Sequence, residues 1–171
     1  VTVSEAAKYV KQNTAYFCRV FNNIKSISRS KFSFCGALFG GAYLLYRKMY
    51  KLGAIITSIE AIIMILSAYL SNYIASTPAF KELYEAYNSY DVNAIMSSLG
   101  ALSTQEVFVF YLYSFLSIAS IVISVLIGVF ANRMYFKHCK KQIIKIKNSN
   151  DNQQEFDKAI KQKGGVNTPL A

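Results

Sequence analysis

The sequence has few of the residues, and none of the motifs, from which most enzyme and metal sites are built. It has three cysteines, an odd number without a Cys-x-x-Cys pair, so it predicts neither a disulfide framework nor a metal site. His138 is the single histidine and lies in a basic stretch, which is typical of a solvated residue or one at the lipid headgroups rather than a ligand. A nucleophile elbow, a His-Glu-x-x-His motif and a phosphate-binding glycine loop are all missing. We therefore expect a protein that is not an enzyme and holds no cofactor.

Charged residues are nearly absent from two long stretches. Residues 52–74 include one charge, Glu60, and residues 107–131 include none. At about 1.5 Å per residue, a helix of either length exceeds the roughly 30 Å hydrocarbon core of a bilayer. The sequence therefore predicts an all-α integral membrane protein. It would have two transmembrane helices, a short interfacial or re-entrant helix and amphipathic flanking helices.

Acidic residues are scarce, with 9 Asp and Glu against 19 Lys and Arg, and the net charge is +10. The basic residues gather in residues 1–34, 47–51 and 132–171, whereas residues 75–106 hold Lys81 and four acidic residues. The positive-inside rule then predicts cytoplasmic termini and an external link. The same excess predicts contact with anionic lipid headgroups, and without a nucleic-acid motif it predicts no nucleic acid as partner.

These patterns divide the chain into six predicted segments. Residues 32–46 would be about 22 Å long as a helix, which is short for a span, so the pattern leaves re-entrant and spanning arrangements open. The segments are an amphipathic cytoplasmic helix with a basic loop at 1–31, an interfacial half-helix at 32–51, transmembrane helices at 52–74 and 107–131, an extracytoplasmic link of two short helices at 75–106, and a basic cytoplasmic tail at 132–171 that ends in a flexible Gly164-Gly165 segment.

Glu60 is the sharpest candidate for a functional residue. It lies nine residues into the first predicted span, and an ionisable residue inside a membrane is a functional hypothesis by default. The structural alternative is that Glu60 is protonated or bonds a serine of the second span. Arg47 or Lys48 would be its partner if the half-helix folds back against the span.

Two aromatic and basic clusters flank the predicted spans, and each predicts either membrane anchoring or recognition of a headgroup or protein partner. They consist of Tyr46, Arg47, Lys48 and Tyr50 before the first span, and of Asn132, Arg133 and Tyr135 after the second.

Small and polar residues form a stripe on each predicted span. In lipid such a stripe normally faces another helix, because small side chains let two backbones approach closely. We expect the two stripes to face each other in a hairpin, or to face a second copy of the chain. The stripes include Ser67 and Ser71 in the first span and Ser117, Ser120, Ser124 and Gly128 in the second.

Residues 32–50 read FSFCGALFGGAYLLYRKMY. This stretch resembles the signature of the bacterial membrane family catalogued as domain of unknown function 2628, through Phe32, Phe39, Gly40 and the run 44–50. Residues 132–138 are similar to its closing motif, and the Gly-Gly pair at 164–165 resembles a tail seen in some members. The chain departs from the signature at four positions: Ser33 and Phe34 replace an Asn-Trp pair, Gly41 replaces a proline and Tyr43 replaces a tryptophan.

The resemblance implies a small bacterial membrane protein and supplies no activity. Some relatives carry a short zinc-binding head, which would precede Val1 here. The leading hypothesis is a membrane-embedded interaction or scaffold protein, multi-pass in the bacterial cytoplasmic membrane, with a protein partner or a second copy of itself. The alternative is a small transporter or channel component that uses Glu60 in an oligomeric polar path. An enzyme acting on lipid ranks last.

Overall fold

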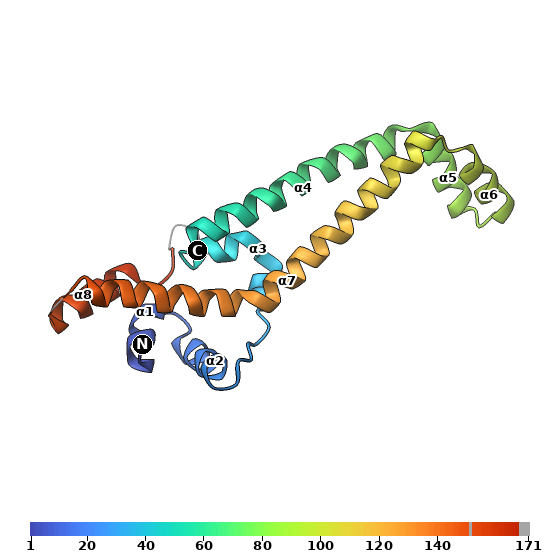
Figure 1. Cartoon of the computed structure of the whole chain (residues 1–171). Helices are drawn as coiled ribbons and strands as arrows, with labels where there is room; N and C mark the ends of the chain where they lie inside the picture. Colours follow the sequence, from blue (N-terminus) through green and yellow to red (C-terminus); the bar gives the residue numbers. More distant parts are fainter. Residues whose placement is uncertain (151, 168–171) are drawn as a thin grey trace. The chain divides into compact units, whose positions relative to one another are not determined.

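The computed structural model describes residues 1–150 and 152–167, and in this part of the chain it has eight helices and no strand (Figure 1). The predicted all-α fold class is confirmed for these residues. The helices are α1 (Val3–Val10), α2 (Thr14–Ile27), α3 (Phe34–Tyr46), α4 (Tyr50–Ser76), α5 (Pro78–Asn88), α6 (Val92–Ala101), α7 (Thr104–Asn148) and α8 (Gln153–Lys163).

Local capping signals explain where several helices begin. At α1 the Thr2 hydroxyl accepts the Glu5 N–H at 3.2 Å while the Glu5 carboxylate accepts the Thr2 N–H at 2.7 Å, which is a capping box. Pro78 occupies the start of α5, where its missing N–H costs nothing. Asp91 Oδ1 accepts two N–H groups at the start of α6. Residues 75–106 thus hold the two short helices that the sequence predicts.

The amphipathic segment at the N-terminus forms two helices, where the sequence predicts one. The break lies between α1 and α2, where Lys11 and Asn13 have φ values of 58° and 55°. Left-handed backbone ends a helix because it turns the next N–H groups away from the helix axis. Asn tolerates this conformation better than most residues, so Asn13 is the local signal for the break.

Two glycines let α3 lie close to the start of α4. A Cβ on Gly41 would meet the backbone and hydroxyl of Thr57, and a Cβ on Gly53 would meet Leu45. Gly40 has a φ of 48° inside α3 and kinks it. The predicted short helix is therefore present as a kinked piece packed on α4.

Helices α4 and α7 are the two, among the described residues, that are long and apolar enough to cross a membrane. Helix α4 exceeds its predicted bounds, 52–74, by two residues at each end. Helix α7 has 45 residues and continues 17 residues beyond the predicted end at residue 131. The basic segment that follows the second apolar run is therefore a continuation of the same helix.

The chain divides into two compact units within α4 and α7. Unit 1 is Val1–Ser58 with Ile123–Ala171, and unit 2 is Ile59–Val122. In unit 1 the predicted basic tail, residues 132–171, contributes to a core through residues of α7 and α8. The fully buried side chains of this core include Val10, Phe17, Val20, Leu44, Tyr135, Ile143, Ile146 and Ile160.

Unit 2 consists of the second part of α4, the first part of α7 and the helical hairpin that α5 and α6 form between them. Helices α5 and α6 lie side by side (Figure 1). The Phe80 ring of α5 stacks against that of Phe110 in α7, with 6.2 Å between centres. Phe80 is buried, whereas Tyr84, Tyr87 and Tyr90 are more than half exposed.

Candidate functional site

Arg47 is a buried cation surrounded by aromatic rings. It follows the last residue of α3, and its backbone N–H donates to the Tyr43 carbonyl at 3.1 Å. Arg47 is 4% exposed. Its guanidinium carbon lies 4.4 Å from the ring centre of Phe17 in α2 and 5.3 Å from that of Tyr135 in α7. The rings of Tyr46 and Tyr43 lie 5.5 and 5.7 Å away. We call these four rings the aromatic box.

The aromatic box offsets part of the cost of burying a positive charge. Ring faces carry partial negative charge, and a cation held over one gains about 0.5–2 kcal/mol. Arg47 has no ion pair with a carboxylate in the described part of the chain. Its Nε and Nη1 atoms are buried and have no hydrogen-bond partner among the residues that the structure describes. Since an arginine stays charged at physiological pH, the rings hold a permanent cation that joins α2, α3 and α7.

Asn132 lies one helical turn before Tyr135 on α7 and is fully buried. Its amide nitrogen donates to the Tyr16 hydroxyl at 3.0 Å and to the Lys31 carbonyl at 2.9 Å. These bonds connect α7 to α2 and to the loop between α2 and α3. The Asn132 carbonyl oxygen and the Tyr135 hydroxyl are buried without a partner in the described residues.

The segment after α8 docks on α1 and on the end of α3. The Gly165 N–H donates to the Tyr9 carbonyl at 2.6 Å, and the Asn167 N–H donates to the Tyr46 carbonyl at 2.9 Å. Lys48 Nζ donates to the Gly164 carbonyl at 2.8 Å. A Cβ on Gly164 would collide with the Tyr9 carbonyl, and Gly165 has a φ of 83°. The prediction of a flexible Gly-Gly tail is therefore wrong, because both glycines are buried in a specific contact.

Two ion pairs attach α1 to the C-terminal helices of unit 1. Lys8 Nζ lies 2.9 Å from Asp157 Oδ1 in α8, and Lys147 Nζ in α7 lies 3.0 Å from Glu5 Oε1. Hydrogen bonding to the Thr2 N–H, and then to Lys147, holds the pKa of Glu5 below its ordinary value. The hydrogen bond from Lys8 lowers the pKa of Asp157 in the same way.

The structure brings together four of the predicted site residues from the two flanking clusters. Tyr46, Arg47 and Tyr135 meet in the aromatic box, and Asn132 lies beside it. Phe17, Tyr43 and Tyr16 are not among the predicted site residues: Phe17 and Tyr43 are buried aromatic residues of α2 and α3, and Tyr16 is 39% exposed. The remaining predicted residues, Lys48, Tyr50 and Arg133, lie outside the box: Lys48 is half-buried and the other two are exposed.

The predicted residues of the two apolar helices are placed as follows. Glu60 is half-buried on α4 in unit 2, and its pairing with Arg47 or Lys48 and its transport role stay predictions. A Cβ on Gly128 would meet Phe32 and Ala37, so the close approach at Gly128 is to α3 and the residues before it, whereas the prediction paired this stripe with that of the first span or with a second copy of the chain. The other stripe residues are half-buried or exposed: Ser67, Ser117 and Ser124 are half-buried, and Ser71 and Ser120 are exposed.

The chemistry of the aromatic box is that of binding and positioning. No cluster of three or more His, Cys, Asp or Glu side chains in the described residues is arranged to hold a metal ion. The box consists of a cation, four rings and tyrosine hydroxyl groups, and in residues 1–150 and 152–167 no carboxylate pairs with the cation. Its most direct effect is to fix α7 against α2 and α3.

The fold and the site together define a helical protein that has a basic folded unit and two helices of membrane-spanning length and hydropathy. The chain belongs to the family described as "Protein of unknown function (DUF2628)", whose model matches residues 4–141. The resemblance drawn from residues 32–50 is thereby confirmed. Neither a curated protein nor a solved structure matches the chain significantly.

Proposed function

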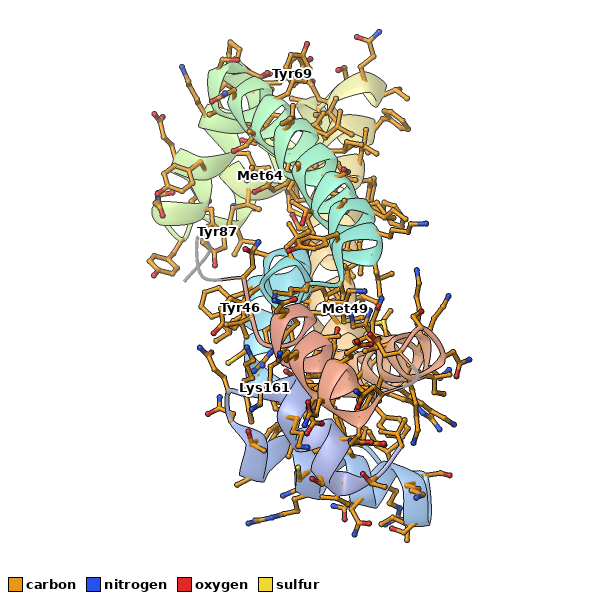
Figure 2. All side chains as sticks on the ribbon, turned by 90° about the vertical axis from the view of Figure 1, so that its left-hand side faces the viewer. Tyr46, Met49, Met64, Tyr69, Tyr87 and Lys161 are labelled. Atoms are coloured by element: carbon orange, nitrogen blue, oxygen red, sulfur yellow. The ribbon has the colours of Figure 1, made fainter. Side chains whose placement is uncertain are left out.

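We propose that the protein is a membrane-embedded interaction or scaffold protein in which α4 and α7 cross the bilayer. The exposed apolar surface of these helices carries the proposal. In their most apolar stretches only 6% and 17% of residues are buried. Met64 and Tyr69 on α4 are 67% and 71% exposed (Figure 2). Soluble monomers rarely expose apolar patches beyond a few hundred Å², whereas hydrocarbon solvates such surfaces.

The distribution of charge between the units supports one orientation of the protein in the membrane. Eighteen of the 19 Lys and Arg lie in unit 1, and unit 2 holds Lys81 with five acidic residues, Glu60 among them. Positive segments near spans are retained on the cytoplasmic side. Unit 1 contains both chain ends, so we place both termini in the cytoplasm and the α5–α6 hairpin outside. The host membrane would be the bacterial cytoplasmic membrane.

Unit 1 supplies the interaction surface in this proposal. Its apolar residues form a core around the aromatic box, so its basic residues are displayed on a folded body rather than on a loose tail. A positive body beside the inner leaflet is attracted to anionic headgroups by about 1 kcal/mol per basic residue near the surface. A scaffold role needs such a body to be held in place, and α4 and α7 would hold it there.

Membrane retention and crosslinking test the proposal. Extraction of membranes at high pH should leave the protein in the pellet, and release into the supernatant would contradict it. Disulfide crosslinking of Glu60→Cys, in a Cys18→Ser and Cys35→Ser background, should give no more homo-oligomer than Ile59→Cys. Strong crosslinking at position 60 alone would place Glu60 at the centre of an oligomer and favour the transporter alternative.

A further inference from the structure

A groove runs between the start of α4 and the second half of α7, entirely within unit 1. It consists of two hollows that follow one another along both helices. Leu52 lines the first hollow and Ile56 the second, one turn apart on α4. On α7, His138 lines the first and Met134 the second, again one turn apart. We call the two together the α4–α7 groove.

The first hollow is basic and has a volume of about 770 Å³. Four lysines line it, together with His138, Asn148 and an apolar floor that includes Met49; the lysines are Lys48, Lys51, Lys141 and Lys145. Lys48 is engaged with the Gly164 carbonyl. The other three form no ion pair in residues 1–150 and 152–167. None of the described residues in this lining is acidic, so the described lining concentrates positive charge.

The second hollow is apolar and has a volume of about 460 Å³. Its lining includes Ile123, Leu126 and Phe130, and Leu126 and Phe130 are 48% and 44% exposed. Arg133 and Lys137 line the same hollow at the end nearer the basic one. Apolar contacts thus give way to cationic ones in one direction along α7.

We propose that the α4–α7 groove binds an anionic phospholipid. The phosphate lies among Lys51, Lys141 and Lys145, and an acyl chain lies along Ile123, Leu126 and Phe130. Charge complementarity selects an anion for the basic hollow, because clustered like charges are stabilised by a counter-charge. The apolar hollow then selects a lipid over a free phosphate ion, since an inorganic ion leaves that surface empty. Three predicted site residues outside the aromatic box, Lys48, Tyr50 and Arg133, line this groove.

This inference rests on the proposed membrane location, and its test separates the two. Native mass spectrometry of the full chain in detergent would titrate phosphatidylglycerol, phosphatidylcholine with the same acyl chains, and inorganic phosphate as competitor. We expect phosphatidylglycerol to bind at least about tenfold more tightly than phosphatidylcholine, because each lysine near an anionic headgroup raises the binding constant roughly five-fold. We also expect inorganic phosphate to displace it poorly. Equal binding of the two lipids would overturn the proposal, and displacement by equimolar phosphate would reassign the hollow to a free ion.

Matched variants distinguish the groove from overall charge. The triple variant Lys51→Gln, Lys141→Gln and Lys145→Gln should reduce phosphatidylglycerol binding to the level of phosphatidylcholine. The control Lys25→Gln, Lys31→Gln and Lys158→Gln removes the same charge at exposed sites outside the groove and should retain the preference. Equal losses in both variants would overturn the site.

A second pair of variants tests the contact with the acyl chain and leaves the lysines unchanged. Leu126 and Val125 are adjacent on α7 and 48% and 49% exposed, but Leu126 alone lines the apolar hollow. Leu126→Gln should weaken phosphatidylglycerol binding, and Val125→Gln should not. If Val125→Gln weakens binding as much, the acyl assignment fails. Solubility without detergent would instead defeat the proposed function, whatever the lipid titration shows.

Discussion

The guanidinium carbon of Arg47 lies 4.4 Å from the ring centre of Phe17, which is 30 positions earlier in the chain. Tyr135, 88 positions later, lies on the same cation at 5.3 Å. One buried side chain thus contacts three helices of unit 1.

Arg47 stabilises unit 1 by filling the aromatic box, and its charge contributes less. Arg47→Ala should lower the free energy of unfolding by ~2–4 kcal/mol, because it leaves a cavity among four rings. Arg47→Met should cost less than about 1.5 kcal/mol, since it fills much of the same volume and leaves no charged partner buried alone. Denaturant-dependent alkylation of Cys139, which is 1% exposed, reports the unfolding of unit 1. If Arg47→Met lowers the free energy of unfolding as much as Arg47→Ala does, the positive charge itself is required.

Asn132 and Arg133 are sequence neighbours with different roles. Asn132 is fully buried and donates two hydrogen bonds, whereas Arg133 is exposed. Asn132→Ala should destabilise unit 1 by about 1–3 kcal/mol because two bonds and packing volume are lost. Arg133→Ala should change stability by less than about 0.5 kcal/mol. The same Cys139 alkylation assay measures both, and a larger effect at Arg133 would contradict the assignment.

Gly164 is required for docking of the segment after α8. Gly164→Ala should displace this segment, because a Cβ there would collide with the Tyr9 carbonyl. Hydrogen exchange at the Gly165 amide, which donates to Tyr9, should then speed up. Gly100→Ala is the control. No atom of the described residues lies within 4 Å of a Cβ at Gly100 in α6, so this change should stabilise its helix by ~0.5–1 kcal/mol. Unchanged exchange at Gly165 in Gly164→Ala would show that the contact is not specific.

Acid should loosen α1 from the rest of unit 1. Glu5 and Asp157 have pKa values below their ordinary 4.5 and 3.8 in the folded state. A lowered folded pKa contributes stability above the unfolded pKa, and that stability is lost as the pH falls through the folded value. The unfolding midpoint of the wild type should therefore fall as the pH drops below about 4.5. In the double variant Glu5→Gln, Asp157→Asn the unfolding midpoint should depend less on pH. If it falls in parallel with that of the wild type, these two carboxylates are not the cause.

Local signals predicted the parts of the fold that depend on neighbours in sequence. The two short helices predicted within residues 75–106 are present, and their starts are set locally by Pro78 for α5 and by Asp91 for α6. The long apolar runs predicted α4 and α7 because length and hydropathy need no tertiary information.

The candidate site required contacts that no local pattern reports. Arg47 lies in a basic cluster that the sequence predicts as an anchor or recognition site, yet Phe17 and Tyr135 bury it from distant positions. The docking of Gly164 on Tyr9 is likewise a contact across most of the chain. Such pairings depend on how helices meet, and helical periodicity identifies a buried face without naming its partner.

Labelling of intact cells with a membrane-impermeant maleimide tests the central claim most directly. Lys81→Cys lies in α5, in the unit with few positive charges, and Lys25→Cys lies in α2, in the basic unit. The account predicts that Lys81→Cys is labelled in intact cells and that Lys25→Cys, like the wild type, is labelled only after lysis. Labelling of Lys25→Cys from outside, or protection of Lys81→Cys until lysis, would contradict two membrane-crossing helices with the basic unit inside.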